Sequence, residues 1–460
     1  MTDETLKVSS IQSTYPIDDQ TGDILLKNGK GRLQVGKTKI ACLVTARMRF
    51  LPEQGIYFDC EFAETYGLSP YSIATEGKRL KIDENFFEVI PVSIIPRHTL
   101  HNTVQCTYIL KCKATVTGTD LTDIDTMTLH IFGFNRFSSH KTFNHVEGTN
   151  RTHVSYVVCE LGEYRLILRE LLKQSDATKR KSPTASTWLS HVAQLMKRDG
   201  STFTPKKIEK YIRALGMTLS FMRGAAEFGL LSVGFRSNDI VFESWPILNG
   251  EHHNHDNWFD LHYHPDSSTS YFEEIFPLIY AQIESEADEV FWGRIIMTYC
   301  QANSVTYVPN AIILIQVALE TMSHRWKCTQ SEKAEPSTSC DSVKTTGKIR
   351  DYLCREGIPI ELSYYDPVFA ERFRNKGFSE WDVVRLLCDI RNSYVHADNN
   401  GVQKFNLSAD ESMRVLHICL LVLEYAILRK LGYSGYYRNR LSHAQAGTVE
   451  LVPWDEARPS

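Results

Sequence analysis

The feature that most constrains this chain is a change of hydrophobic periodicity between its two halves. Residues from about 20 to 165 contain short runs of alternating apolar and polar residues, separated by Gly, Asn and Asp turn signals. From Tyr271 onward, apolar residues recur at helical spacing. A period of two suits a strand and a period of 3.6 suits a helix. We therefore expect an α+β protein, with a β-rich N-terminal domain that includes some helices, followed by an all-α helical bundle.

The same patterns suggest where the domains lie. At 460 residues the chain is long enough for two or three hydrophobic cores. We place a β-rich sensor or regulatory domain at residues 1–270, a helical domain at 271–445 and a tail at 446–460. Within the first domain, residues 182–223 are expected to form helices, and a strand pair follows at 229–245.

Helix start and stop signals divide the helical domain further. The apolar segment 310–326 is predicted to be a buried central helix, and the Ser-, Thr- and charge-rich segment 327–347 a mobile loop. Three later helices are expected to begin at capping residues. These are Asp366 before Pro367, Ser379 with Asp382, and Ser408 with Glu411, the last helix ending at Leu431 before Gly432.

Composition excludes several classes of protein. Hydrophobic residues make up 42% and charged residues 23%, which is typical of globular proteins. Eleven scattered cysteines without a C-x-x-C pair argue against a zinc ribbon, and we expect no cofactor. A net charge of −4 excludes a wholly basic nucleic-acid binder, although a local basic patch could still bind RNA. The polar N-terminus and the lack of a membrane-spanning stretch favour a cytoplasmic protein without a membrane partner.

One charged residue stands out in the helical domain. Arg391 lies at helical spacing on the apolar stripe of the segment WDVVRLLCDIRNSYVHA. A guanidinium stays charged, so a buried one needs an anion nearby. Glu320, isolated in the apolar helix at 310–326, is the expected partner. His396 follows five positions after Arg391, and a helix that ends near Val395 would let both reach one site.

Arg391, Asn392 and His396 resemble the Arg-Asn-x-x-x-His signature of HEPN domains, over roughly residues 287–432. A β-rich first half joined to such a domain also resembles the ApeA-type anti-phage defence proteins. The resemblance implies a metal-independent endoribonuclease acting as a homodimer or higher oligomer, with two copies of the motif facing one cleft. It makes His396 the general acid or base, and Arg391 the residue that braces the phosphate.

The resemblance further implies that Asn392 positions the substrate and that Glu320 orients Arg391. The implied biology is abortive anti-phage defence by cleavage of RNA, with tRNA as a candidate and a phage-derived trigger sensed by the N-terminal domain. The chemistry is consistent, because RNA carries its own nucleophile and a cutter needs only a proton shuttle and a cation. The alternative is a non-catalytic HEPN bundle that binds a nucleotide or a partner while the first half performs the recognition.

A second motif points to a different class of enzyme. Gly31, Gly36, Lys37 and Thr38 match the spacing of a phosphate-binding loop, which would imply a P-loop nucleotidase. Such a loop must leave a strand and open a helix. The residues that follow alternate like a strand, so the sequence favours a hairpin turn here.

Two further groups of residues are weak candidates. The His-rich loop holds possible metal ligands, although a solvated loop is favoured and no metal site is predicted. Its candidates are His252, His253 and His255. Near the C-terminus, cations mix with aromatic residues that could stack on RNA bases, although surface packing explains them as well. These are Arg429, Lys430, Tyr436, Arg438 and Arg440.

Overall fold

The computed structural model places the chain in two compact units. The β unit comprises Met1–Gly216 and Glu227–Asn254, and the helical unit comprises Met217–Ala226 and His255–Ser460. Ten residues, Met217–Ala226, thus belong to the helical unit. The sequence suggested a single boundary at residue 270 and did not anticipate this. The structure describes residues 11–17, 23–35, 38–49, 55–62, 78–83, 85–94, 104–110, 114–132, 142–147, 150–171, 189–226, 230–246, 270–304, 307–331, 345–376, 381–395, 407–441 and 449–455.

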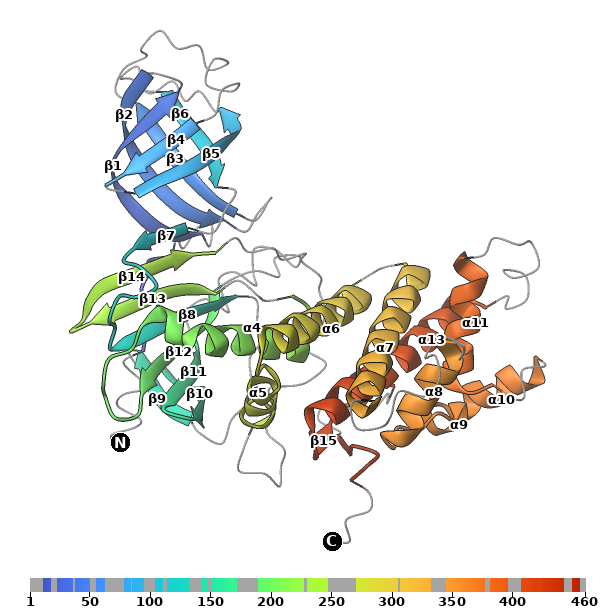
Figure 1. Ribbon diagram of the computed structural model, residues 1–460. Helices are drawn as coiled ribbons and strands as arrows, with labels where there is room; N and C mark the ends of the chain where they lie inside the picture. The colour runs from blue at the N-terminus through green and yellow to red at the C-terminus, as the bar shows by residue number, and fades with distance from the viewer. Residues whose placement is uncertain are drawn as a thin grey trace. The chain divides into compact units, whose positions relative to one another are not determined.

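A closed six-stranded antiparallel barrel forms the first part of the β unit (Figure 1). Side chains along its first two strands alternate between buried and more exposed positions, as the period-two pattern of the sequence predicts. The strand order is β1-β2-β3-β6-β5-β4. The strands are β1 Ile24–Val35, β2 Thr38–Arg49, β3 Gly55–Phe62, β4 Lys78–Ile82, β5 Asn85–Ile94 and β6 Val104–Leu110.

An eight-stranded antiparallel sheet forms the second part, in the order β7-β14-β13-β8-β12-β11-β10-β9. Its core joins that of the barrel, because Trp245 of the sheet stacks on Phe87 of the barrel with ring centroids 5.8 Å apart. The strands are β7 Ala114–Thr117, β8 Thr126–Phe132, β9 Thr142–Glu147, β10 Asn150–Leu161, β11 Tyr164–Glu170, β12 Leu189–Lys197, β13 Leu231–Arg236 and β14 Asp239–Trp245.

Strand β12 corrects the expectation that all of residues 182–223 are helical. Leu189–Lys197 lies between β8 and β11 and is buried along most of its length. A strand covered on both faces has few polar positions, so its apolar run resembles a buried helix. The later part of the range is helical as predicted, in η1 (Pro205–Ile208) and α4 (Glu209–Arg223).

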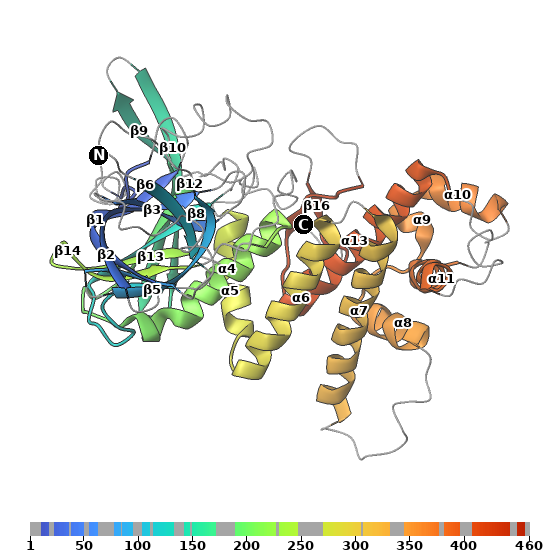
Figure 2. The same cartoon turned by 90° about the horizontal axis from the view of Figure 1, so that it is seen from above.

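The helical unit is a bundle in which α7 packs against α6, α8, α11 and α13 (Figure 2). Its helices are α5 Tyr271–Gln282, α6 Glu286–Ser304, α7 Val308–Ser331, α8 Thr345–Arg355, α9 Leu362–Tyr365, α10 Pro367–Asn375, α11 Val383–Val395 and α13 Ala409–Leu431. The α+β class is therefore confirmed. None of the described helices combines the length and apolar composition needed to cross a lipid bilayer.

Two of the predicted helix starts are confirmed by their caps. The Asp366 carboxylate accepts a hydrogen bond from the Phe369 amide, 2.9 Å, with Pro367 at the first helical position of α10. Ser408 and Glu411 form a reciprocal capping box at α13. That helix ends as expected at Gly432, which has a φ of 77° that glycine adopts without steric cost.

Other helix boundaries differ from the sequence-based expectation. Helix α11 begins at Val383, and its cap is Asp382, whose carboxylate accepts from the Arg385 amide at 2.7 Å. Residues 327–331 and 345–347 of the expected loop are helical, and α8 and α9 were not anticipated. Part of the expected tail forms strand β16 (Glu450–Leu451), which pairs with β15 (Tyr436–Tyr437).

Candidate functional site

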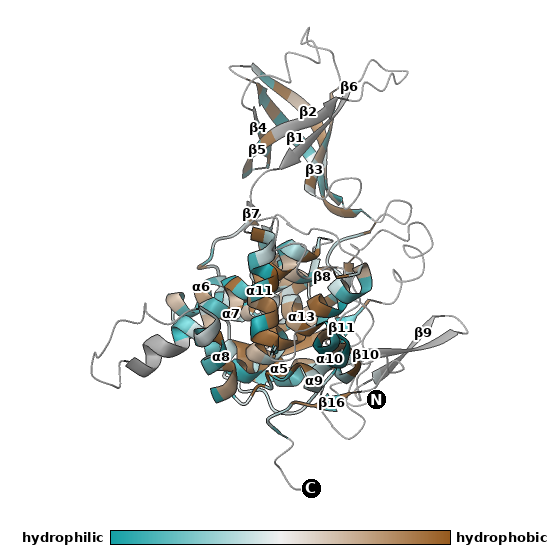
Figure 3. Cartoon of the chain, turned by 90° about the vertical axis from the view of Figure 1, so that its right-hand side faces the viewer, coloured by the Kyte–Doolittle hydropathy of each residue, from teal (hydrophilic) through white to brown (hydrophobic). Residues whose placement is uncertain are grey.

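The Arg-Asn pair of the candidate motif lies in the last described turn of α11. This helix buries one face against the bundle, and apolar and polar segments alternate along it (Figure 3). Ile390 and Ser393 are buried, whereas Arg391 is half-buried and Asn392 is exposed. Arg391 thus sits at the edge of the apolar stripe, where its charge can reach solvent.

Arg391 is positioned by its neighbour. Its Nη1 atom donates to the Asn392 Oδ1 atom at 3.1 Å. Within the described part of the chain, no carboxylate forms an ion pair with Arg391. Arg385, on the same helix, contrasts with it by pairing with Asp389 at 3.6 Å. His396, the proposed acid or base, lies outside the described residues.

Glu320 does not orient Arg391, contrary to the expectation from the sequence. Its Oε1 atom accepts from the Thr345 hydroxyl at the start of α8, 2.8 Å, and no ion pair to Arg391 exists among the described residues. Burial raises the pKa of Cys388, with a smaller contribution from Glu320, which places Glu320 near Cys388. Among the described residues, the partner of Glu320 is therefore Thr345 of α8.

An exposed apolar surface adjoins the Arg-Asn pair. Tyr307, just before α7, is 61% exposed, and Val395 is 44% exposed. Burial raises the pKa of Tyr394, and the charge of the Tyr307 hydroxyl raises it further. We call Tyr307, Tyr394 and Val395 the α11 patch. Exposed apolar side chains of this kind are available for contact with another protein surface.

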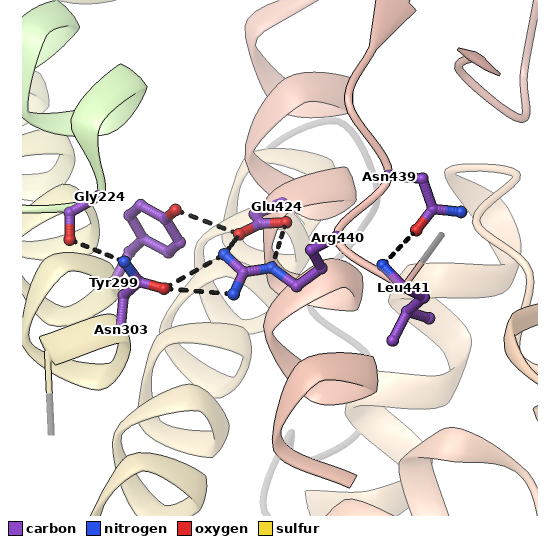
Figure 4. A network of polar contacts seen from close by, with 7 residues as sticks. All are labelled: Gly224, Tyr299, Asn303, Glu424, Asn439, Arg440 and Leu441. Carbon is purple, nitrogen blue, oxygen red and sulfur yellow. Dashed lines mark hydrogen bonds and ion pairs between the residues drawn. The ribbon is translucent and has the colours of Figure 1, made fainter. Parts of the chain in front are cut away.

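The helical unit does contain a buried ion pair, but it involves other residues (Figure 4). The Arg440 guanidinium binds the fully buried Glu424 carboxylate of α13 through two nitrogens, with an Nε to Oε2 distance of 3.0 Å. Tyr299 donates to the same carboxylate at 3.1 Å. Asn303 accepts from Arg440 at 3.2 Å and donates to the Gly224 carbonyl at 3.0 Å.

This network is a structural centre of the bundle. Burial alone would lower the pKa of Arg440, but Glu424 and Tyr299 hold it above its ordinary value, so the guanidinium stays charged. The network joins the chain after β15 to α13, α6 and the end of α4. Sequence reasoning missed it, although the signal was present: Glu424 is a lone acid in the apolar run LLVLEYAIL.

The buried position of Arg440 also removes it from the candidate RNA-binding residues, because its donors are used by Glu424 and Asn303. Arg429 pairs with Glu356 at 3.6 Å and lies over the Trp454 ring. Three other members of that group remain partly exposed: Lys430, Tyr436 and Arg438. Arg429 and Arg440 are therefore held by carboxylates, and RNA contact by the other three residues stays a prediction.

The P-loop interpretation is wrong. Gly31 lies in β1 and Thr38 in β2, and the two strands pair antiparallel with Val35 opposite Thr38, so a hairpin replaces the strand-loop-helix arrangement.

The His-rich loop, with His252, His253 and His255, lies outside the described residues. Among the residues that the structure describes, no three His, Cys, Asp or Glu side chains cluster closely enough to hold a metal ion.

The fold and the motif define a class of α+β protein in which a β unit of barrel and sheet accompanies a helical bundle bearing an Arg-Asn pair. Residues 119–253 match the family model of the YopA central domain, and residues 286–450 match that of the YopA C-terminal domain. The second match contains Arg391, Asn392 and His396, whereas the six-stranded barrel lies outside both.

One relative shows how far this similarity extends. The SPbeta prophage-derived protein YopA of Bacillus subtilis (strain 168) is 27% identical over 273 residues, which is 58% of this chain and 58% of that protein. The chain thus matches little more than half the length of that relative. No solved structure matches the chain.

Proposed function

We propose that the helical unit is a HEPN-type endoribonuclease that cuts RNA without a metal ion. The observation that carries the proposal is the state of Arg391: it is half-buried, held by Asn392, and without a carboxylate partner among the described residues. A cation kept in place but not neutralised is suited to an anionic ligand such as a phosphodiester.

The chemistry follows from the residue types. The 2′-oxygen of a ribose attacks the adjacent phosphorus, the bond from phosphorus to the 5′-oxygen breaks, and a 2′,3′-cyclic phosphate and a 5′-hydroxyl result. A neutral His396 takes the proton from the 2′-hydroxyl, and a protonated imidazole returns one to the leaving 5′-oxygen. Arg391 stabilises the charge that develops on the phosphorane, and Asn392 holds the guanidinium in position.

The α11 patch supports a homodimer as the active form. Apolar side chains that are exposed beside the Arg-Asn pair would be covered by the same surface of a second copy. That contact would bring two His396 residues to one cleft, so that one could act as base and the other as acid.

The relative's prophage origin fits a role in conflict between phage and host. A ribonuclease that responds to a phage-derived trigger, sensed by the β unit, would end infection by cleaving host RNA, with tRNA as a candidate. The trigger and the RNA target follow from the resemblance to ApeA-type proteins, and the site geometry supports only the phosphodiester chemistry.

The test is RNA cleavage by purified protein in excess chelator. We expect wild-type protein to produce fragments that end in 2′,3′-cyclic phosphate, and Arg391→Ala and His396→Ala to lose activity by about a hundredfold or more. Arg385→Ala, on the same helix but paired with Asp389, should retain it. Cleavage that survives in His396→Ala, or that chelator abolishes, would refute the proposal.

A second function is favoured by the same patch. If the bundle binds a protein partner or a nucleotide without catalysis, the α11 patch would serve that ligand. Intact RNA after prolonged incubation with wild-type protein, together with tight binding lost in Tyr307→Glu, would support this function and exclude the first.

A further inference from the structure

One outward face of the six-stranded barrel is rich in cations. Along β1 the side chains of Lys30 and Arg32 are exposed, and Gly31 and Leu33 between and after them are buried. Lys39 is exposed on β2, and Arg79 is exposed on β4. Since β2, β1 and β4 are neighbours in the barrel, these side chains share one surface.

The strand register fixes how these groups are arranged. Arg32 lies directly opposite Lys81 on β4, and Lys81 lies opposite Phe86 on β5. The Lys81 ammonium sits over the Phe86 ring at 5.3 Å, and Phe86 is 62% exposed. We call Lys30, Arg32, Lys39, Arg79, Lys81 and Phe86 the barrel face.

The acids near this face pair with only some of its cations. Asp83 binds Lys27 at 2.5 Å, and Glu88 lies 3.7 Å from Arg79. Among the described residues, no carboxylate pairs with Lys30, Arg32 or Lys39.

We propose that the barrel face binds single-stranded nucleic acid. Side chains two residues apart on a strand, such as Lys30 and Arg32, repeat at about 6.7 Å, a spacing that lets successive cations follow the phosphates of an extended strand. The exposed Phe86 ring offers a surface on which a base can stack.

This site is separate from the proposed nuclease centre, since its residues belong to the β unit and the Arg-Asn pair belongs to the helical unit. Its test must therefore not depend on cleavage. Fluorescence anisotropy of full-length His396→Ala protein with a labelled deoxythymidine homopolymer meets this need, because that strand has no 2′-hydroxyl to act as nucleophile. A uridine homopolymer then shows whether RNA binds equally.

The key variant combines Lys30→Gln, Arg32→Gln and Lys39→Gln. We expect its affinity to fall by about tenfold or more, and its slope of log affinity against log salt to decrease by about 2 as three phosphate contacts are lost. The matched control combines Lys206→Gln, Lys207→Gln and Arg236→Gln. These three exposed cations of the β unit lie outside the barrel, and affinity should stay close to the starting value.

Phe86→Ala tests the stacking contact separately. We expect about tenfold weaker binding with an unchanged salt slope, because a ring is lost and no charge. Circular dichroism and thermal melting of each variant should match the parent protein, since the altered side chains are exposed. Unchanged affinity in the triple variant, or an equal loss in the control, would overturn the proposal. Unchanged affinity in Phe86→Ala would overturn the proposal that the bound nucleic acid is single-stranded.

Discussion

At the scale of single residues, one physical rule led us to predict a wrong ion pair. The same rule explains a second ion pair, which we overlooked. A lone charge in an apolar helix needs a counter-ion, which led us to join Glu320 to Arg391. Glu320 lies at the surface of α7 beside Thr345, where water can satisfy it. The rule holds for Glu424, whose partner Arg440 comes from an irregular segment that periodicity does not predict.

We expect this difference to appear in stability. Glu424→Ala should lower the free energy of unfolding by about 3 to 5 kcal/mol, because it leaves the Arg440 guanidinium buried without a counter-ion. Glu320→Ala should lower it by about 1 kcal/mol or less, since it removes one hydrogen bond at a partly exposed site. Urea unfolding of both variants measures the contrast, and equal losses would contradict it.

Two buried histidines make the β unit sensitive to acid. Burial lowers the pKa of His130 to about 4 and that of His191 to about 3. The neutral His130 ring accepts from the Thr14 amide at 3.2 Å and donates to the Leu231 carbonyl at 3.0 Å. The contact with the Thr14 amide requires the uncharged ring, because a protonated Nε2 atom cannot accept a hydrogen bond.

The sign of the pH dependence follows from these directions. The unfolded histidines take up protons near pH 6.5, whereas the folded ones resist protonation until about pH 4 or below. Stability of the β unit should therefore be complete above pH 6.5 and decline as the pH falls toward 4. Thermal melting across this range measures the decline. His130→Gln should melt at a lower temperature, and its melting temperature should depend less steeply on pH. An unaltered pH dependence in this variant would show that His130 does not contribute to the acid sensitivity.

At the scale of elements, caps and periodicity predicted the helices well where their ends carry local signals. Ser408 with Glu411 and Asp366 with Pro367 fix their helix starts through contacts a few residues apart. Strand β12 could not be identified in the same way, because its burial depends on β8 and β11, which are distant in sequence. Helix α8 was missed because it is short and contains Gly347 near its start.

The cap of α13 gives a test at this scale. Ser408→Ala removes the side chain that accepts from the Glu411 amide and should lower the free energy of unfolding by about 1 kcal/mol. Ser412→Ala, on the same helix, removes a hydroxyl that only donates to the Ser408 carbonyl at an exposed position. Its effect should stay within about 0.5 kcal/mol. Denaturant titration of both variants measures the two free energies of unfolding. Equal effects would exclude a role for the cap.

At the scale of the whole molecule, the sequence predicted a β-rich half and a helical half, and the fold class is confirmed. It did not reveal that the β-rich half contains a closed barrel followed by a sheet, because closure depends on β1 pairing with β4, and β2 and β3 lie between them in the sequence. For the candidate site, the sequence predicted that Arg391 and Asn392 lie on a helix, and α11 carries both. Their surroundings were not predicted, since they depend on how α7 and α8 pack.

Dimerisation is the prediction that belongs to this scale, and it rests on the proposed function. Tyr307→Glu places a charge in the α11 patch, so light scattering should report a dimer for wild-type protein and a monomer for the variant, with RNA cleavage lost. Val368→Glu is the matched control, because Val368 is also 61% exposed but lies on α10. A dimer that persists in Tyr307→Glu would separate the patch from self-association.

The segment that carries Arg440, β15 and β16 comes after every helix of the bundle in the chain. It supplies the guanidinium that neutralises Glu424, and Trp454 closes over the end of α13 by donating to the Tyr433 carbonyl at 2.8 Å. During translation the helices therefore leave the ribosome before the piece that completes their interior. Until residue 440 has emerged, the Glu424 carboxylate of a nascent protein would lack the cation that neutralises it, and the bundle would stay loosely packed around it.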